Sequence, residues 1–218
     1  QVASDGERIY LLAEDEAHDR LYSVPAAGGE VREVGRLEAG SFSGLQVGGG
    51  ENDPVLVANW NSAVIPAEVT RIEAATGGRR ALSAFNAERA AAIDWQPVQD
   101  FWFTSKRGRR IHNLIALPPA FDPSKKYPLF VLIHGGPHGM YKDEFFVRWN
   151  YHLLAQPGYV VLMTNYSGST GYGERFAQAI QGDPLAGPAD EINQAADEAI
   201  RRYPFIDASR QAAGGASY

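Results

Sequence analysis

The chain has 218 residues, of which 44% are hydrophobic and 21% charged, a composition typical of a folded globular protein rather than a disordered one. Its formal net charge of −6 argues against a nucleic-acid partner, because nucleic-acid binding depends on clustered Lys and Arg side chains. The sequence contains no cysteine, which excludes disulfides, a thiol nucleophile and thiolate metal ligands.

The apolar runs of the sequence are short. The longest, such as Leu129–Ile133, cannot span a bilayer, and no signal peptide opens the chain. We therefore expect a soluble chain with no membrane insertion, and the compartment stays open between cytoplasmic and periplasmic or secreted. The chain starts at Gln1 without a methionine and stops at Tyr218, so we expect a fragment of a longer protein.

Residues 1–97 have the pattern of short antiparallel strands separated by Gly, Asp and Asn. We predict two copies of one repeat. The strand segments of the first copy are Ile9–Leu12, Leu21–Val24 and Val31–Val34, and those of the second are Val55–Ala58, Val69–Ile72 and Arg79–Leu82. Ile9 and Val55 are 46 residues apart, and Gly28 and Gly77 are 49 apart. This spacing suits four-stranded propeller blades of roughly 40–50 residues. A small β-sandwich with coincidental spacing is the alternative.

Residues 98–218 have the pattern of an α/β domain. The segments Phe101–Ser105 and Leu114–Leu117 predict an antiparallel hairpin, and the basic run at its tip, residues 106–110, is interpreted as solvated. Leu129–Ile133 and Tyr159–Met163 predict buried strands of a mostly parallel sheet. Helices are predicted over residues 145–155 and from Pro188 to Tyr203, followed by a short strand over Gln211–Ala213.

A candidate nucleophile lies at the end of the chain, in Gly214-Gly215-Ala216-Ser217-Tyr218. The last four residues match the first four positions of the Gly-x-Ser-x-Gly elbow, which holds a serine hydroxyl clear of the sheet on a sharp strand-to-helix turn. Glycine is needed at position 215 because backbones approach closely there. The short match alone is weak, but its place after a predicted helix and strand is where such an elbow belongs.

A second motif, His134-Gly135-Gly136-Pro137, follows a predicted buried strand. In α/β hydrolases a loop at this point donates one backbone N–H to the oxyanion hole, and the residue after the nucleophile donates the other. We expect these donors to be Gly136 and Tyr218; a tight turn without a ligand is the alternative. His134 and His138 lack the helical spacing and third ligand of a metal site, so no metal and no cofactor are expected.

A third motif, Asn165 to Gly173, is a loop rich in glycine and hydroxyl groups. No lysine follows its glycines, so we interpret it as a border of the active site rather than a phosphate cradle. Asp190 and Glu191 are interpreted as favourable charges at a helix N-terminus, without a catalytic role.

In this order the three motifs resemble the prolyl oligopeptidase family of serine peptidases, particularly its acylaminoacyl-peptidase-like and dipeptidyl-peptidase-like branches. The resemblance implies C-terminal blades of a β-propeller over residues 1–97 and the N-terminal part of an α/β-hydrolase domain over 98–218. It also implies Ser217 as the nucleophile, Gly136 and Tyr218 as oxyanion donors, and oligopeptides as substrates. Two positions depart from the family, which commonly has Arg at the place of Ser167 and Trp near Leu185.

A catalytic triad needs an Asp and a His besides the serine, and the sequence contains no His after Ser217. In this fold the Asp and His follow the serine, whereas all five histidines here precede Ser217. We expect the isolated chain to be inactive and the rest of the same protein to supply both groups. A carboxylesterase and a non-catalytic propeller scaffold or pseudoenzyme are the alternatives. The sequence leaves open exopeptidase or endopeptidase action, the P1 preference and whether the protein is a homo-oligomer.

Overall fold

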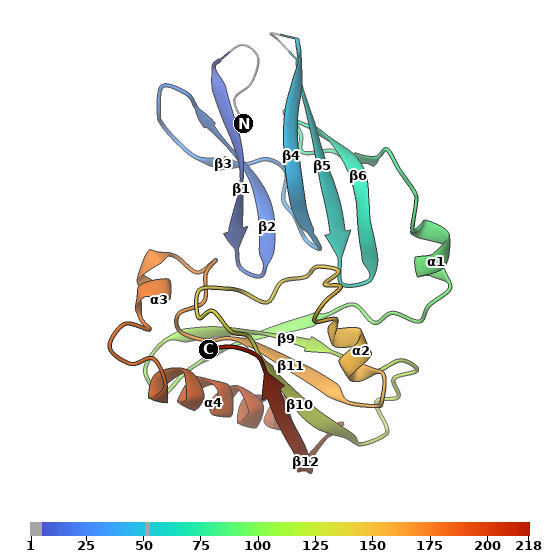
Figure 1. The fold of residues 1–218 in the computed structure, drawn as a ribbon, viewed down its shortest axis with the longest axis vertical. Coiled ribbons are helices and arrows are strands. Elements are labelled where there is room, and N and C mark those ends of the chain that lie inside the picture. The colour runs from blue at the N-terminus through green and yellow to red at the C-terminus, as the bar shows by residue number, and fades with distance from the viewer. Residues whose placement is uncertain (1–5, 51–52) are drawn as a thin grey trace. The chain divides into compact units, whose positions relative to one another are not determined.

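The computed structural model describes residues 6–50 and 53–218, and Gln1, the predicted start of the propeller segment, lies outside them. The chain forms two compact units (Figure 1). The first comprises residues 1–93 and the segment Lys142–Phe145. The second comprises residues 94–141 and 146–218, and it contains all three sequence motifs.

The first unit is built from two antiparallel sheets. One has the order β1 (Arg8–Asp15), β2 (His18–Pro25), β3 (Arg32–Glu33), and the other has the order β4 (Ser41–Gly50), β5 (Asp53–Ser62), β6 (Ile65–Glu73), β7 (Arg79–Ala81). A short helix, α1 (Ala87–Ala91), follows. The six predicted strand segments are confirmed, whereas β4 was not predicted. Its glycines suggest a turn, and Gly44 does adopt a positive φ of 62° where the β4–β5 register shifts.

Apolar side chains of both sheets share one core. Its buried members are Tyr10, Leu21, Val34, Leu37, Phe42, Leu45, Leu56, Ala58 and Ile72. The segment Lys142–Phe145 joins this unit through Asp143, whose buried carboxylate accepts the backbone N–H groups of Gly40 at 2.6 Å and Ala63 at 2.7 Å.

The second unit has a five-stranded mixed sheet. Its order is β12 (Ile206–Gly215), β10 (Tyr127–Ile133), β11 (Val160–Asn165), β9 (Arg110–Ala116), β8 (Gln99–Thr104). β10 pairs in parallel with both β11 and β12, whereas the β8–β9 hairpin is antiparallel and adds to β11 in the antiparallel sense. The predicted hairpin and the two buried strands are confirmed. The predicted mostly parallel sheet is parallel only in its β11–β10–β12 part.

The helices of this unit differ in part from the prediction. The expected helix over 145–155 is wrong in its first half, because α2 covers only Tyr151–Ala155. Asn150 has an extended backbone, and its side chain accepts the N–H groups of His152 and Leu153, so it starts the helix late. A short helix, α3 (Glu174–Gln178), was not predicted. The long predicted helix is confirmed as α4 (Ala186–Arg202).

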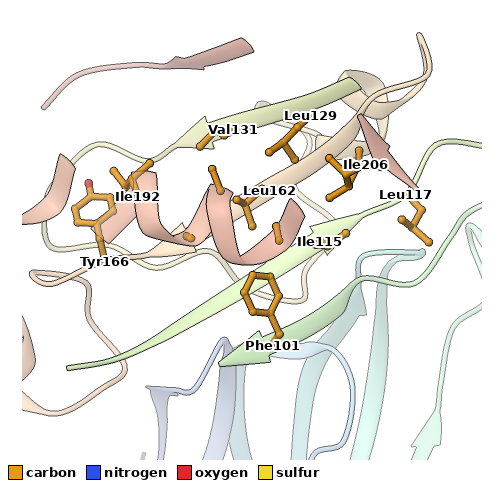
Figure 2. Close-up of a cluster of buried hydrophobic side chains, with 13 residues drawn as sticks. Phe101, Ile115, Leu117, Leu129, Val131, Leu162, Tyr166, Ile192 and Ile206 are labelled. Atoms are coloured by element: carbon orange, nitrogen blue, oxygen red, sulfur yellow. The ribbon is translucent and has the colours of Figure 1, made fainter. Parts of the chain in front are cut away.

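Helix α4 packs its apolar stripe on the sheet. Figure 2 shows side chains from the strands and from α4 pointing toward one another to form a single core. Ile192, Ala195 and Ala199 lie on the inner face of the helix, because residues three and four apart share a face. The small alanines allow close approach, and together with Leu129 and Leu162 they are almost fully excluded from solvent.

Candidate active site

The turn after β12 positions the candidate nucleophile. Gly215 lies opposite Ile133 in the parallel β10–β12 register, and a Cβ on Gly215 would stand 2.3 Å from the Ile133 carbonyl oxygen. Only glycine fits there without moving the backbone. Ser217, two residues on, has a φ of +69°, a left-handed conformation that residues other than glycine adopt rarely. Such a conformation costs energy and is typical of a nucleophile elbow.

The loop after β10 lies directly against this turn. A Cβ on Gly135 would be 2.5 Å from the carbonyl oxygen of Ala216 and 2.9 Å from Cβ of Ser217. Gly136 has a φ of +128°, a conformation that side chains other than glycine rarely allow. The structure therefore brings together the glycine motif and the serine motif, which lie far apart in the sequence. Tyr218, the other predicted donor residue, follows Ser217 and is 41% exposed.

His134, at the start of this loop, has contacts on both ring nitrogens. Its Nδ1 lies 2.9 Å from the carbonyl oxygen of Gly135, and its Nε2 lies 3.0 Å from Oγ of Ser169. Its ring stacks on Tyr166 at 4.4 Å, and the Tyr166 hydroxyl donates to the His134 carbonyl oxygen at 2.5 Å. Burial lowers the pKa of His134, against a smaller opposing effect of its bond to Gly135. The imidazole is thus kept neutral and fixed.

Tyr166 is itself buried and keeps its proton. Burial, assisted by the nearby Tyr218, raises the pKa of the Tyr166 phenol. A protonated phenol is what the bond to the His134 carbonyl oxygen requires, since the hydroxyl is the donor.

The glycine loop after β11 supports the same region. The backbone N–H of Thr170 donates to the carbonyl oxygen of Gly139 at 3.1 Å, in addition to the contact of Ser169 with His134. Asn165, at the end of β11, binds Tyr141 and Tyr172 through its buried amide. The loop therefore rests on residues 134–141, which agrees with its interpretation as a border of the site.

The tip of the β8–β9 hairpin was predicted as a solvated basic run. Residues 106–108 and 110 are exposed, as predicted, but the tip also has polar partners in the same unit. The backbone N–H of Lys106 donates to Gln194 at 2.7 Å, and Arg107 forms ion pairs with Asp183 and with Asp190, the latter at 3.3 Å. Arg107 thus has one carboxylate partner just before α4 and another in its first turns, so the exposed tip is also a structural contact.

Glu191 also does more than favour a helix terminus. Its side chain is completely buried, and its carboxylate accepts the backbone N–H of Ser167 at 2.8 Å and the Ser167 hydroxyl at 2.9 Å. The sequence carries a signal for this position, because Glu191 lies four and eight residues before the buried Ala195 and Ala199. A carboxylate on the apolar stripe of a helix needs an internal partner.

In residues 6–50 and 53–218, no three His, Cys, Asp or Glu side chains gather as ligands. His138 is turned to the carbonyl oxygen of Ala177 at 3.2 Å, while His134 faces Ser169. A further buried histidine, His112, stacks on Trp102 at 4.2 Å and contacts Tyr172 and Asp100. No helix among the described residues is long and apolar enough to cross a bilayer.

Residues 145–218 match the prolyl oligopeptidase family of peptidases. Dipeptidyl-peptidase 5 of Porphyromonas gingivalis is 30% identical over 220 residues, which cover 100% of this chain and 31% of that protein. The Pyrococcus horikoshii acylaminoacyl peptidase has a similar structure, with a TM-score of 0.81 and 26% identity over 96% of this chain and 32% of that one.

An acylaminoacyl peptidase in complex with Z-Gly-Gly-Phe-chloromethyl ketone gives a TM-score of 0.82 and 26% identity, over 97% of this chain and 32% of that one. The chain spans about a third of the length of these proteins. The matches identify the chain as a relative of the prolyl oligopeptidase family, as its three sequence motifs indicated.

Proposed function

We propose that this chain carries the nucleophile and the oxyanion donors of a serine peptidase that hydrolyses oligopeptides through an acyl-enzyme. One observation carries the proposal: Ser217 has a left-handed backbone directly after strand β12, with Gly135 of the glycine motif packed against it. A serine in that position presents its hydroxyl to a substrate carbonyl beside a bare backbone loop.

In the proposed reaction, Oγ of Ser217 attacks the peptide carbonyl, and a general base takes the hydroxyl proton. The oxyanion accepts hydrogen bonds from the backbone N–H groups of Gly136 and Tyr218. The general base then protonates the leaving amine, and water releases the acyl group from Ser217.

The general base and its carboxylate partner are proposed to come from outside this chain. Within it, His134 is neutral and bound to Ser169, and every histidine precedes Ser217. The chain spans about a third of its relatives, which leaves room for both groups.

The architecture proposed for the whole protein is a β-propeller with an α/β-hydrolase domain. Residues 1–97 would be the C-terminal blades and residues 98–218 the N-terminal part of the hydrolase domain. The 46- to 49-residue offset of the two antiparallel sheets and the structural likeness to acylaminoacyl peptidases support this assignment. A propeller that restricts entry would favour oligopeptides over folded proteins.

Amide and ester substrates test the peptidase assignment. We expect the full-length gene product to cleave short peptide amides, and Ser217→Ala to abolish this cleavage. The peptide ligand of one structural relative makes a peptide with Phe at the cleaved bond a suitable first substrate. Cleavage of short acyl esters without any cleavage of peptides would instead favour the carboxylesterase alternative.

A further inference from the structure

The loop that borders the candidate site is attached to a buried negative charge. Glu191 is fully excluded from solvent, and its two carboxylate oxygens accept both the N–H and the hydroxyl of Ser167, which is itself fully buried. Ser167 lies near the start of the loop that runs to Gly173. A carboxylate without water around it is strongly unfavourable unless a cation lies near it.

That cation comes from the hairpin tip. Nη1 of Arg109 lies 3.8 Å from Oε1 of Glu191 and donates to the Ser167 hydroxyl at 3.0 Å. Among the residues that the structure describes, Arg109 is the only basic side chain within ion-pair distance of Glu191. The three side chains therefore form one network, with Ser167 between the guanidinium and the carboxylate.

The fixed loop in turn holds the oxyanion motif. Two residues beyond Ser167, the hydroxyl of Ser169 binds Nε2 of His134, and the next backbone N–H, that of Thr170, donates to Gly139. These contacts lie on both sides of Gly136. A shift of the loop at Ser167 would therefore move the segment that contains the proposed oxyanion donor.

We infer that Arg109 is a positioning residue of the active site, which neutralises Glu191 and through Ser167 fixes the loop that supports the oxyanion segment. The inference rests on the proposed function, since it concerns the geometry of that site. Arg109 does not touch the substrate, and its effect passes through Ser167 and the Ser169–His134 contact.

The experiment uses the full-length gene product and three variants: Arg109→Met, Arg109→Met combined with Glu191→Gln, and Arg107→Met as the matched control. Arg107 belongs to the same hairpin tip but pairs with the half-buried Asp183 and the exposed Asp190. Wild-type protein is first shown to react with a fluorophosphonate at Ser217. If it does not, the proposed function fails, independently of Arg109.

We expect Arg109→Met to lower kcat on a peptide amide by about tenfold or more with KM nearly unchanged, because oxyanion contacts act mainly in the transition state. The double variant should recover to within about threefold of wild type, because a neutral glutamine side chain in place of Glu191 needs no cation and can still bind Ser167. Arg107→Met should remain within about threefold of wild type. Because a loss of folded protein would also lower the apparent kcat without changing KM, kcat is expressed per mole of folded protein, with the folded fraction measured by circular dichroism.

Wild-type kcat in Arg109→Met would overturn the inference, and so would an equal loss in Arg107→Met. A double variant as inactive as Arg109→Met would also contradict it, because the role assigned to Arg109 is neutralisation of Glu191. Should Arg109→Met fail to fold, the double variant decides alone: an active enzyme supports the inference and an inactive or unfolded one contradicts it.

Discussion

The side-chain amide of Asn165 binds both backbone groups of Tyr141: its Oδ1 accepts the Tyr141 N–H at 2.7 Å, and its Nδ2 donates to the Tyr141 carbonyl oxygen at 3.1 Å. Nδ2 also donates to the Tyr172 hydroxyl at 2.8 Å. Asn165 is fully buried. Its side-chain amide therefore joins three parts of the unit: the end of β11, the segment at Tyr141 that follows the oxyanion motif, and the glycine loop at Tyr172.

Asn165→Asp is therefore expected to destabilise the protein by about 2 to 4 kcal/mol, because a buried carboxylate cannot donate to Tyr141 and Tyr172. Thermal unfolding of wild type and variant at neutral pH measures the effect. Asn193→Asp is the matched control, since Asn193 is exposed on α4. Equal melting temperatures for the two variants would show that the amide does not bridge these segments.

Gly215→Ala tests the close approach at the elbow. The added Cβ would lie 2.3 Å from the Ile133 carbonyl oxygen, and backbone atoms on both sides would have to move. We expect a loss of stability of about 1 to 3 kcal/mol or more and a fall in Ser217 labelling of about 100-fold, because the hydroxyl is displaced. Gly48→Ala is the control, because its Cβ would meet no atom within 4 Å. A labelling rate for Gly215→Ala equal to that of the control would refute the elbow geometry.

The pH dependence of stability tests the neutral state of His134. Burial lowers its pKa below the ordinary value of 6.5, so the unfolded chain binds a proton more readily than the folded one. The contribution that neutral His134 makes to the free energy of unfolding is fully present above pH 6.5. It is lost as the pH falls toward the lowered pKa, because the unfolded chain then binds a proton that the folded chain does not.

Melting temperatures between about pH 7.5 and about pH 5 measure this loss. We expect His134→Gln to be less stable at the upper end of this range but to lose less stability on acidification, since glutamine does not titrate. His138→Gln removes an exposed histidine of the same loop and serves as the control. A slope for His134→Gln identical to that of the control would contradict the assignment.

The features readable from the sequence are those where the backbone demands a particular residue. Gly135, Gly136 and Gly215 stand where side chains would collide or where φ is positive, so glycine appears at each position. The alternation of β1, β2, β5 and β6 and the apolar stripe of α4 are equally visible, because burial of one face imposes a period. These features sufficed to indicate the motifs and most of the strands.

The features that sequence reasoning missed depend on partners far apart in the chain. Nothing near Arg109 in the sequence shows that it faces Glu191, so their ion pair was not predicted. Ser167 stands where the family commonly has Arg, which marked this position as unusual. The sequence does not show that Arg109, from another element, donates to Ser167 instead. The early half of the predicted helix over 145–155 failed because Asn150 caps a shorter one.

Labelling with a fluorophosphonate, followed by peptide mapping, tests the central claim that Ser217 is the nucleophile. The full-length gene product is treated with the reagent, and the modified residue is located by mass spectrometry, with Ser217→Ala and the control Ser43→Ala in parallel. Ser43 is exposed on β4. We predict one adduct on Ser217, absent in Ser217→Ala and present in Ser43→Ala. An adduct on another residue, or labelling that survives in Ser217→Ala, would contradict the account.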